Sequence, residues 1–567
     1  MPKDSIVVLG VHDGHNAGVS LIKDGKVLVA VNEERYTNIK NYSGIPRNSI
    51  QNIFQISQVS SSEITAIAIG GLLRTTAPLV EEESLKLKLY RKLGPILKSH
   101  KMTSLYVKFL HKRRKMKELN KIFQSLNIHE KPVYFVEHHL AHAACAFYQR
   151  PWKDDTLILT LDGAGDGLSA TVSVGTTEGI KRIASTTSYH SISNNMYSEI
   201  TGYLGLKRWE HEYKIMGMAP YGRSEFVANI FRKYFSLNPK NRLEFKNMLG
   251  AMGDYVQPKF RKLLAEHRFD NIAAACQLHF ESLMKKWVNN AIIETDLHKI
   301  ACSGGSFLNV KANKEIRELD QVTDVFFYPV CDDSGISTGA ALSIYNQLCE
   351  IDGKKPNISP LSDLYLGREF EEKKIKNTIE KSSKLNFTYN DEIEETIAEE
   401  LNQGKIIAIF NGREEFGPRA LGNRSIVAKA DDLAVIRKIN FAIKQRDFWM
   451  PFAPSIIEED ADKYLINARP ARYMIEAFST NPEAKEIIAG LHPYDSTARP
   501  QTVNEWNNNW LKILTIFKEL SGYSGILNTS YNLHGFPIVG TPEVAIKTFL
   551  KSGLDILAIG NFIVKKC

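Results

Sequence analysis

The chain has 567 residues, 43% of them hydrophobic and 24% charged, and a formal net charge of +8. Its length predicts about two to four domains, each able to bury a core. Six cysteines without a CxxC pair are too few for a disulfide framework, so we expect reduced thiols and a cytoplasmic location. Because the sequence shows neither the hydrophobic core of a signal peptide nor an apolar run of roughly twenty residues, we expect no membrane partner.

The first predicted strand, Ser5 to Val11, ends in a turn of small residues that carries Asp13 and His15. Two more predicted strands follow, Val19 to Lys23 and Lys26 to Asn32. A strand, a small-residue turn with an aspartate and then a hairpin is the expected opening of the actin- and hexokinase-like nucleotide-binding fold, where glycines let backbone amides approach phosphate oxygens. Because Asp-Gly turns are common in other hairpins, this signal alone is weak.

Two charged segments come next. Glu33 to Lys40 places a dense set of charges directly after the third strand, where sites tend to be built, and a solvated loop is the alternative. The basic segment Lys86 to Lys121 lies within a predicted helical region, Leu79 to Leu126. We expect that basic segment to be a charged helical hairpin on the surface; the alternative is a binding surface for a polyanion or an acidic substrate.

Three of the fifteen histidines lie within five positions, at His138, His139 and His142. If this segment is helical, the first and third face the same way, as ligands of a shared metal would, and His139 points elsewhere. The surrounding alanines also suit a buried helix with satisfied imidazoles, so the segment alone leaves both interpretations open. A carboxylate at the end of the predicted strand Thr156 to Leu161 could complete a site that suits iron, manganese or zinc.

Small and acidic residues also follow other predicted strands of this half. The turn Asp162 to Gly167 is a second Gly/Asp turn, and two such turns match the paired phosphate loops of the actin-like fold better than one does. A strand that begins at Lys299 leads into Gly304 and Gly305 before a helix, which is a natural contact for an anion or a nucleotide. Asp333 follows a further strand and is a second carboxylate that the fold could bring to the histidines.

Turn-forming residues replace the periodic pattern between Ile351 and Asp363, and we place a domain boundary there. The expected domains are therefore residues 1–355 and 364–567. Because the second one also contains both predicted strands and predicted helices, the whole chain is expected to be α/β.

Cationic side chains of the second half lie among glycines or beside aromatic residues rather than on a regular helix face. Guanidinium forks spaced by turns are typical of a pocket for phosphate or carboxylate groups. A predicted strand near the C-terminus also ends in small polar donors. We therefore predict an anion pocket that draws on Arg413, Arg419, Arg424, Lys444, Arg446, Ser530 and Asn532.

In this order, the segments resemble the NodU/CmcH family of O-carbamoyltransferases over nearly the whole chain. The run Phe416 to Ser425 is the most specific part of the match. The other matching runs are Asp13 to His15, Glu33 to Arg35, Glu137 to His142, Tyr213 to Gly222, Gln501 to Val503 and Leu527 to Asn532. The resemblance implies an N-terminal domain of actin-like (ASKHA) fold and a C-terminal YrdC-like domain.

The resemblance also implies a division of the chemistry. The YrdC-like domain is expected to form carbamoyl adenylate from carbamoyl phosphate and ATP with Mg²⁺, with loss of phosphate and pyrophosphate. The N-terminal domain is expected to transfer the carbamoyl group to a hydroxyl of a small molecule, a natural product or a sugar. It implies Fe²⁺ or another divalent transition metal, with His138, His142, Asp162 and Asp333 as the ligands.

By the same resemblance, Asp13, His15 and Lys40 lie at the transfer site. One of them would accept the hydroxyl proton and another would stabilise charge on the carbamoyl oxygen, and the sequence leaves open which does which. The seven polar residues of the predicted anion pocket become the contacts to carbamoyl phosphate and to the ATP phosphates. The rim of that pocket departs from the family, because Tyr531 and Phe536 stand where phenylalanine and glutamate are expected.

The sequence leaves two alternatives to an O-carbamoyltransferase. Relatives of both expected domains modify tRNA, and Lys86 to Lys121 is basic, so a threonylcarbamoyl-type transferase or a tRNA-binding protein is the main alternative. Maturation of a protein cysteine, as in HypF-type carbamoyltransferases, is disfavoured because the chain lacks CxxC pairs. We expect no nucleic-acid partner, and the sequence is compatible with a homodimer.

Overall fold

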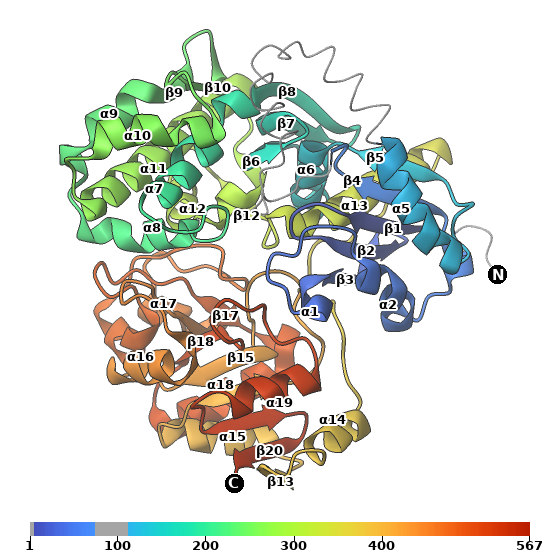
Figure 1. The fold of residues 1–567 in the computed structure, drawn as a ribbon, viewed down its shortest axis with the longest axis vertical. Helices are drawn as coiled ribbons and strands as arrows, with labels where there is room; N and C mark the ends of the chain where they lie inside the picture. Colours follow the sequence, from blue (N-terminus) through green and yellow to red (C-terminus); the bar gives the residue numbers. More distant parts are fainter. Residues whose placement is uncertain (1–4, 74–111) are drawn as a thin grey trace.

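The computed structural model describes residues 5–73 and 112–567 (Figure 1). Of the basic segment predicted to be a surface hairpin, residues 86–111 lie outside the described part of the chain. Within that part the protein is α/β, as expected, and contains two five-stranded sheets and one eight-stranded sheet. Among the described residues, none of the helices combines the length and the apolar character needed to cross a membrane.

The first sheet has the strand order β3-β2-β1-β4-β5. Its strands are β1 (Val7–His12), β2 (Gly18–Lys23), β3 (Lys26–Asn32), β4 (Ala66–Gly70) and β5 (Val133–Val136). The hairpin strands β1, β2 and β3 pair antiparallel, whereas β1, β4 and β5 are parallel. The predicted turn with Asp13 and His15 therefore lies between the two central antiparallel strands.

The second sheet repeats this plan, with the order β12-β11-β6-β7-β8. Its strands are β6 (Thr156–Gly165), β7 (Leu168–Thr176), β8 (Gly179–Thr187), β11 (Lys299–Ser303) and β12 (Asp324–Phe327). Again the three hairpin strands are antiparallel and the added strands are parallel to the first. The turn with Asp166 therefore occupies the same position in the second sheet as the turn with Asp13 does in the first.

Helices α6 (His138–Tyr148) and α13 (Ile336–Ile351) pack against each other and join the two sheets, since α13 lies on β1, β2 and β4 and α6 lies on β6 and β11. Glycines allow the close approach. A Cβ added at Gly339 would lie 1.9 Å from the carbonyl oxygen of Ala141, and one added at Gly10 would lie 2.0 Å from that of Ser337. The N-terminal ends of α6 and α13 therefore lie close to each other.

Most other elements of the first half are helices that surround the sheets (Figure 1). The longest, α11 (Phe269–Thr295), buries Trp287 and packs on its neighbours α8 and α12. The remaining elements are α1 (Glu34–Thr37), α2 (Arg47–Ser57), α5 (Lys112–Ser125), α7 (Glu199–Tyr203), α8 (Glu212–Met218), α9 (Ala228–Tyr234), α10 (Gln257–Leu264), α12 (Val310–Arg317), and the strand pair β9 (Phe235–Asn238) and β10 (Asn241–Asn247). A single predicted helix from Phe307 to Arg317 is instead a 3₁₀ turn, Gly305–Leu308, followed by α12.

The eight-stranded sheet lies below the other two sheets in Figure 1 and has the order β13-β20-β19-β14-β15-β18-β16-β17. Its strands are β13 (Leu385–Tyr389), β14 (Ile407–Phe410), β15 (Arg424–Ala428), β16 (Ala453–Ile457), β17 (Gln501–Val503), β18 (Gly525–Ser530), β19 (Ile556–Ile559) and β20 (Phe562–Lys566). Its helices are α14 (Glu372–Ile379), α15 (Ile393–Asn402), α16 (Ala434–Ile439), α17 (Ala461–Tyr464), α18 (Asn508–Ser521) and α19 (Pro542–Leu550). Two separate apolar clusters, one of which contains α15 and α18, complete the core.

The loop between β14 and β15, which contains the most specific sequence run, is organised around Glu415. One carboxylate oxygen of this buried residue accepts hydrogen bonds from the backbone amides of Leu421, Asn423 and Arg424 at 2.8, 2.9 and 3.1 Å. Burial makes these charge-assisted bonds strong, so the loop has one defined conformation.

The charged segment after β3 connects the two halves of the chain. Arg35 is buried, donates to the carbonyl oxygen of Gly417 at 2.7 Å and lies 3.5 Å from Glu414. Glu33 is also buried and accepts from the backbone amides of Asn48 and Ser49 at the start of α2, at 3.0 and 2.8 Å. The alternative of a solvated loop is therefore wrong for these residues.

Replacing Glu415 with glutamine is expected to lower the free energy of unfolding by about 2 kcal/mol, because a neutral amide is a weaker acceptor for three backbone N–H groups than a carboxylate is. Thermal unfolding followed by circular dichroism would show a lower Tm. The exposed Glu519 provides the matched control, and Glu519→Gln is expected to leave the Tm unchanged. An unchanged Tm in E415Q would contradict the role given to this carboxylate.

Candidate functional site

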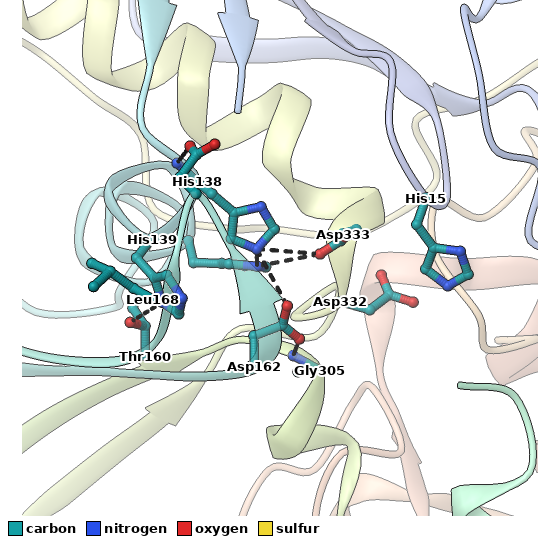
Figure 2. Close-up of polar contacts among 12 residues, drawn as sticks. His15, His138, His139, Thr160, Asp162, Leu168, Gly305, Asp332 and Asp333 are labelled. Atoms are coloured by element: carbon teal, nitrogen blue, oxygen red, sulfur yellow. Dashed lines mark hydrogen bonds and ion pairs between the residues drawn. The ribbon is translucent and has the colours of Figure 1, made fainter. Parts of the chain in front are cut away.

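Four side chains predicted to share a metal converge at the junction of α6, the second sheet and the start of α13 (Figure 2). His138 and His142 come from α6, Asp162 lies in β6, and Asp333 opens the 3₁₀ helix Asp333–Gly335 that leads into α13. Their ligand atoms all lie within 4.8 Å of one another. The structure therefore brings together all four residues, which are far apart in the sequence.

The nitrogen and oxygen atoms of these four side chains cluster closely enough to share one metal ion. His138 Nε2 lies 3.2 Å from His142 Nε2, 3.3 Å from Asp162 Oδ2 and 3.5 Å from Asp333 Oδ1, and the last oxygen is 3.6 Å from His142 Nε2. Two imidazole nitrogens with two carboxylates form a donor set that suits a divalent transition metal. This group of residues could therefore hold a metal ion.

The chain fixes His138 from several sides. Glu137 caps α6 by accepting from the amides of His139 and Leu140, at 3.1 and 2.8 Å. Asp166 accepts from the amide of His138 at 2.8 Å. A Cβ at Gly165 would lie 2.1 Å from the His138 ring, so a side chain at that position would displace the imidazole. The second Gly/Asp turn thus serves to position a metal donor.

Gly304 and Gly305, which were predicted to contact a nucleotide, lie beside the same group. The amide of Gly305 donates to Asp162 Oδ1 at 3.0 Å. Gly304 has a φ of +108°, and a Cβ there would lie 2.3 Å from the carbonyl oxygen of Leu161. In this structure the pair holds the Asp162 carboxylate in place, and its contact with a nucleotide stays a prediction.

The electrostatics of the four residues are coupled. Burial would lower the pKa of His138, but the carboxylates of Asp333 and Asp162 raise it to about 10. Burial would raise the pKa of both carboxyls, but the neighbouring histidines lower it below the usual range. The metal-free site therefore keeps a proton on His138 at neutral pH, in the place that a cation would take. His139 faces away, with Nδ1 2.8 Å from Thr160 Oγ1, and burial lowers its pKa.

The residues predicted at the transfer site take different positions. Asp13 Oδ1 lies 2.6 Å from Lys115 Nζ, in a pair that is almost fully buried. Figure 2 shows His15 on the far side of Asp332 and Asp333 from the histidines. Among the described residues, none forms a hydrogen bond with the buried Nδ1 of His15.

Lys40, the third transfer-site candidate, contacts a different set of residues from Asp13 and His15. Its Nζ pairs with Glu210 Oε1 at 2.9 Å. Its charge also helps to lower the pKa of Lys444, after burial and Arg446. The roles of Asp13, His15 and Lys40 in catalysis stay predictions.

Two arginines of the predicted anion pocket are engaged with the backbone. Arg424 is fully buried, stacks on Phe410 at 3.7 Å and donates to the carbonyl oxygen of Asn411 at 2.6 Å. Arg413 donates to the carbonyl oxygens of Leu28 and Leu366 at 3.0 and 2.8 Å. Their guanidinium groups hold loops together in this structure, and their contact with phosphate stays a prediction.

Lys444, Ser530 and Asn532 do form one cluster, as their shared assignment to one pocket predicts. Lys444 ends the π-helix Asn440–Lys444, and π-helical turns are frequent at functional sites. Its buried Nζ donates to Ser530 Oγ at 3.2 Å and to Asn532 Oδ1 at 2.7 Å. Burial lowers the pKa of Lys444 well below its ordinary value, so an incoming anion would stabilise its charge.

Arg419 and Arg446 gather with Arg499, which the sequence analysis missed. Burial lowers the pKa of Arg446 to about 10 despite Tyr213, and it lowers that of Arg499 well below the ordinary value, with the other two arginines adding to the effect. Buried like charges of this kind favour a bound polyanion. The available signal was position, because Arg499 lies two residues before the matched run Gln501–Val503.

The arginine cluster and the metal group are close to each other. Burial lowers the pKa of Arg419. Cys331 and, to a smaller extent, Asp332 act in the opposite direction, so Asp332 lies close enough to influence this guanidinium. Asp332 directly precedes the metal donor Asp333, and Asn16 Nδ2 donates to it at 3.2 Å. Asp332 therefore lies between the cluster of Arg419, Arg446 and Arg499 and a His/Asp group that could hold a metal.

Comparison with known families agrees with this site. The family described as Carbamoyltransferase N-terminus matches residues 7–342, and the one described as Carbamoyltransferase C-terminus matches residues 398–566. The chain therefore belongs to the carbamoyltransferase family, and it is an enzyme of that family.

Individual relatives cover most of the chain. Uncharacterized protein MJ1051 of Methanocaldococcus jannaschii is 31% identical over 99% of this chain and 100% of its own. Nodulation protein NolNO of Sinorhizobium fredii is 29% identical over 97% of this chain and 79% of its own. Among solved structures, full-length HypF in its phosphate- and nucleotide-bound form covers 61% of this chain and 56% of its own at 15% identity, with a TM-score of 0.33 that is too low to define the fold.

Replacing both His138 and His142 with alanine is expected to remove the bound metal, because two carboxylates alone are a poor site for a transition metal. Elemental analysis of purified protein would show the metal-to-protein ratio falling to the background of the preparation. His139→Ala is the matched control from the same helix turn and is expected to keep its metal. Metal retained in the double variant would contradict this ligand set.

Metal binding is expected to release about one proton per ion at pH 7, because the raised pKa keeps His138 protonated until the metal displaces the proton. The apparent affinity should therefore rise with pH from about 6 to 8. Titration of metal-free protein with Fe²⁺ or Zn²⁺ in a weak buffer with a pH indicator measures this release. No proton release would show that His138 is neutral before the metal binds.

Proposed function

We propose that the protein is an ATP-dependent O-carbamoyltransferase that makes carbamoyl adenylate and then transfers its carbamoyl group to a hydroxyl of a small molecule. The observation that carries this proposal is the buried cluster of Arg419, Arg446 and Arg499, which lies near the His/Asp group within one chain of the carbamoyltransferase family. Carbamoyl phosphate, ATP with Mg²⁺ and a hydroxylated natural product or sugar are the proposed substrates.

We further propose an actin-like (ASKHA) fold for the first half and a YrdC-like fold for the second, as residues 1–355 and 364–567. The matching order and strand directions of the two five-stranded sheets support the first assignment, because a duplicated sheet plan with one turn per half is what paired phosphate loops require. The eight-stranded mixed sheet supports only an α/β second half, so its YrdC-like character rests on the sequence resemblance.

In the activation half-reaction, Lys444 and the cluster of Arg419, Arg446 and Arg499 would bind the phosphate groups of carbamoyl phosphate and ATP. Water attacks the phosphorus of carbamoyl phosphate and releases phosphate and carbamate; a carbamate oxygen then attacks the α-phosphorus of ATP and displaces pyrophosphate, which gives carbamoyl adenylate. Fixed buried cations stabilise negative charge on the phosphates as bonds break, at little cost of reorganisation. Ser530 and Asn532 would hold the Lys444 ammonium in place.

In the transfer half-reaction, an acceptor hydroxyl attacks the carbamoyl carbon and AMP leaves. When bound, a divalent metal held by His138, His142, Asp162 and Asp333 would supply Lewis-acid chemistry to this step. Asp13 or His15 would accept the hydroxyl proton, and Lys40 would stabilise charge on the oxygen. The tRNA-directed alternative rested on relatives of both domains and on the basic segment; in the described part of that segment, Lys115 is buried in an ion pair.

Incubation with carbamoyl phosphate, ATP and Mg²⁺ is expected to release pyrophosphate, and Arg446→Gln should lower kcat/KM for this release by about tenfold or more, since it removes a charged phosphate contact. A coupled pyrophosphate assay measures both. The exposed Arg437→Gln is the matched control and should behave as the wild type.

The double variant H138A/H142A should still release pyrophosphate while losing carbamoyl transfer. No release by folded wild-type protein with a hydroxylated acceptor present would refute the proposal.

A further inference from the structure

The buried ion pair between Lys115 and Asp13 is used by no step described above. Lys115 comes from α5, within the basic segment, whereas Asp13 lies in the turn after β1. Their charged atoms are 2.6 Å apart, and each side chain is only 1% exposed. Lys115 Nζ also donates to the carbonyl oxygen of Gly71 at 3.0 Å and lies 5.7 Å from the centre of the Phe135 ring.

Such a pair is costly to bury, because both ions lose their hydration. An apolar contact of similar volume often stabilises a core to the same extent or more. A helix could be attached to the sheet without it, and α5 already contributes the buried Leu119, Ile122 and Phe123. The pair therefore points to a need for an ionised carboxylate at this position.

The surroundings show which charges act here. His12 is the last residue of β1, and its ring nitrogens lie 3.2 Å from the carbonyl oxygen of Gly70 and 3.0 Å from that of His15. Burial lowers the pKa of His12; Asp333 and Asp13 act against this shift, and His138 and Lys115 add to it. Among these groups, Lys115 is in direct contact with Asp13.

We propose that Lys115 is a positioning residue, whose ammonium keeps Asp13 ionised and fixed at the end of β1, where the carboxylate can accept a hydrogen bond from the acceptor hydroxyl. This inference rests on the proposed placement of Asp13 at the transfer site. Without the cation, burial would favour the protonated acid, which donates a hydrogen bond instead of accepting one.

Infrared difference spectroscopy of the full-length protein at pH 7 tests the proposal, because a protonated carboxyl group has a C=O stretching band that a carboxylate lacks. Lys115→Met is expected to gain one such band, and the double variant K115M/D13N is expected to lack it. Lys115→Arg keeps the charge and should show no new band. The exposed Lys117→Met, in the same helix, is the matched control and should match the wild type.

Two outcomes would overturn the proposal: no new band in K115M, or the same band in K115M/D13N. Should K115M fail to fold, Lys115→Gln carries the same comparison, because its amide is also neutral. A tether that merely attaches α5 would lower the Tm of these variants without creating the band. The spectra involve no carbamoyl chemistry, so pyrophosphate release by the wild-type protein tests the proposed function separately.

Discussion

The packing of α6 on α13 is the contact on which the rest of the site depends. The helices can approach so closely because Gly339 leaves room for the carbonyl oxygen of Ala141. This contact places the two histidines of one helix beside the aspartate that begins the other, although the two segments are far apart in the chain. Each helix also lies on its own sheet, so the metal group sits where the two repeated sheets meet.

Much of the fold could be predicted from local patterns. The strands β1, β2 and β3 were predicted within a few residues, since alternating apolar residues and small-residue turns are local signals, whereas β8 of the second sheet was not predicted. The long helix α11 was not predicted; its first turns, Asp270 to Gln277, are buried on every side, so a regular alternation of apolar and polar faces is absent there. Helical spacing pointed to His138 and His142, and strand ends pointed to nearby carboxylates, but the choice of all four donors as one set came from the family resemblance, which carries spatial information that spacing alone does not.

The cationic residues show where sequence reasoning reaches its limit. Arg413 and Arg424 stood out among glycines, yet their guanidinium groups bind backbone carbonyls. Arg499 is a single arginine without a motif of its own, and only the fold brings it to Arg419 and Arg446. Lys115 belongs to a run of charges that is typical of a solvated helix face, but its partner is in the first turn of the chain. Charge content is visible in a sequence, whereas the partner of each charge is set by tertiary structure.

The contact of Arg35 with Gly417 and Glu414 has a consequence for any attempt to study the halves alone. A chain cut between Ile351 and Asp363 would separate the buried guanidinium of Arg35 from Glu414 and from the carbonyl oxygen of Gly417, and Glu414 would keep only its ion pair with Arg368. Arg413 would lose its carbonyl acceptor at Leu28 by the same cut. The two halves are therefore joined by buried polar contacts, and each half studied alone would expose or strand charged groups that the intact chain keeps paired.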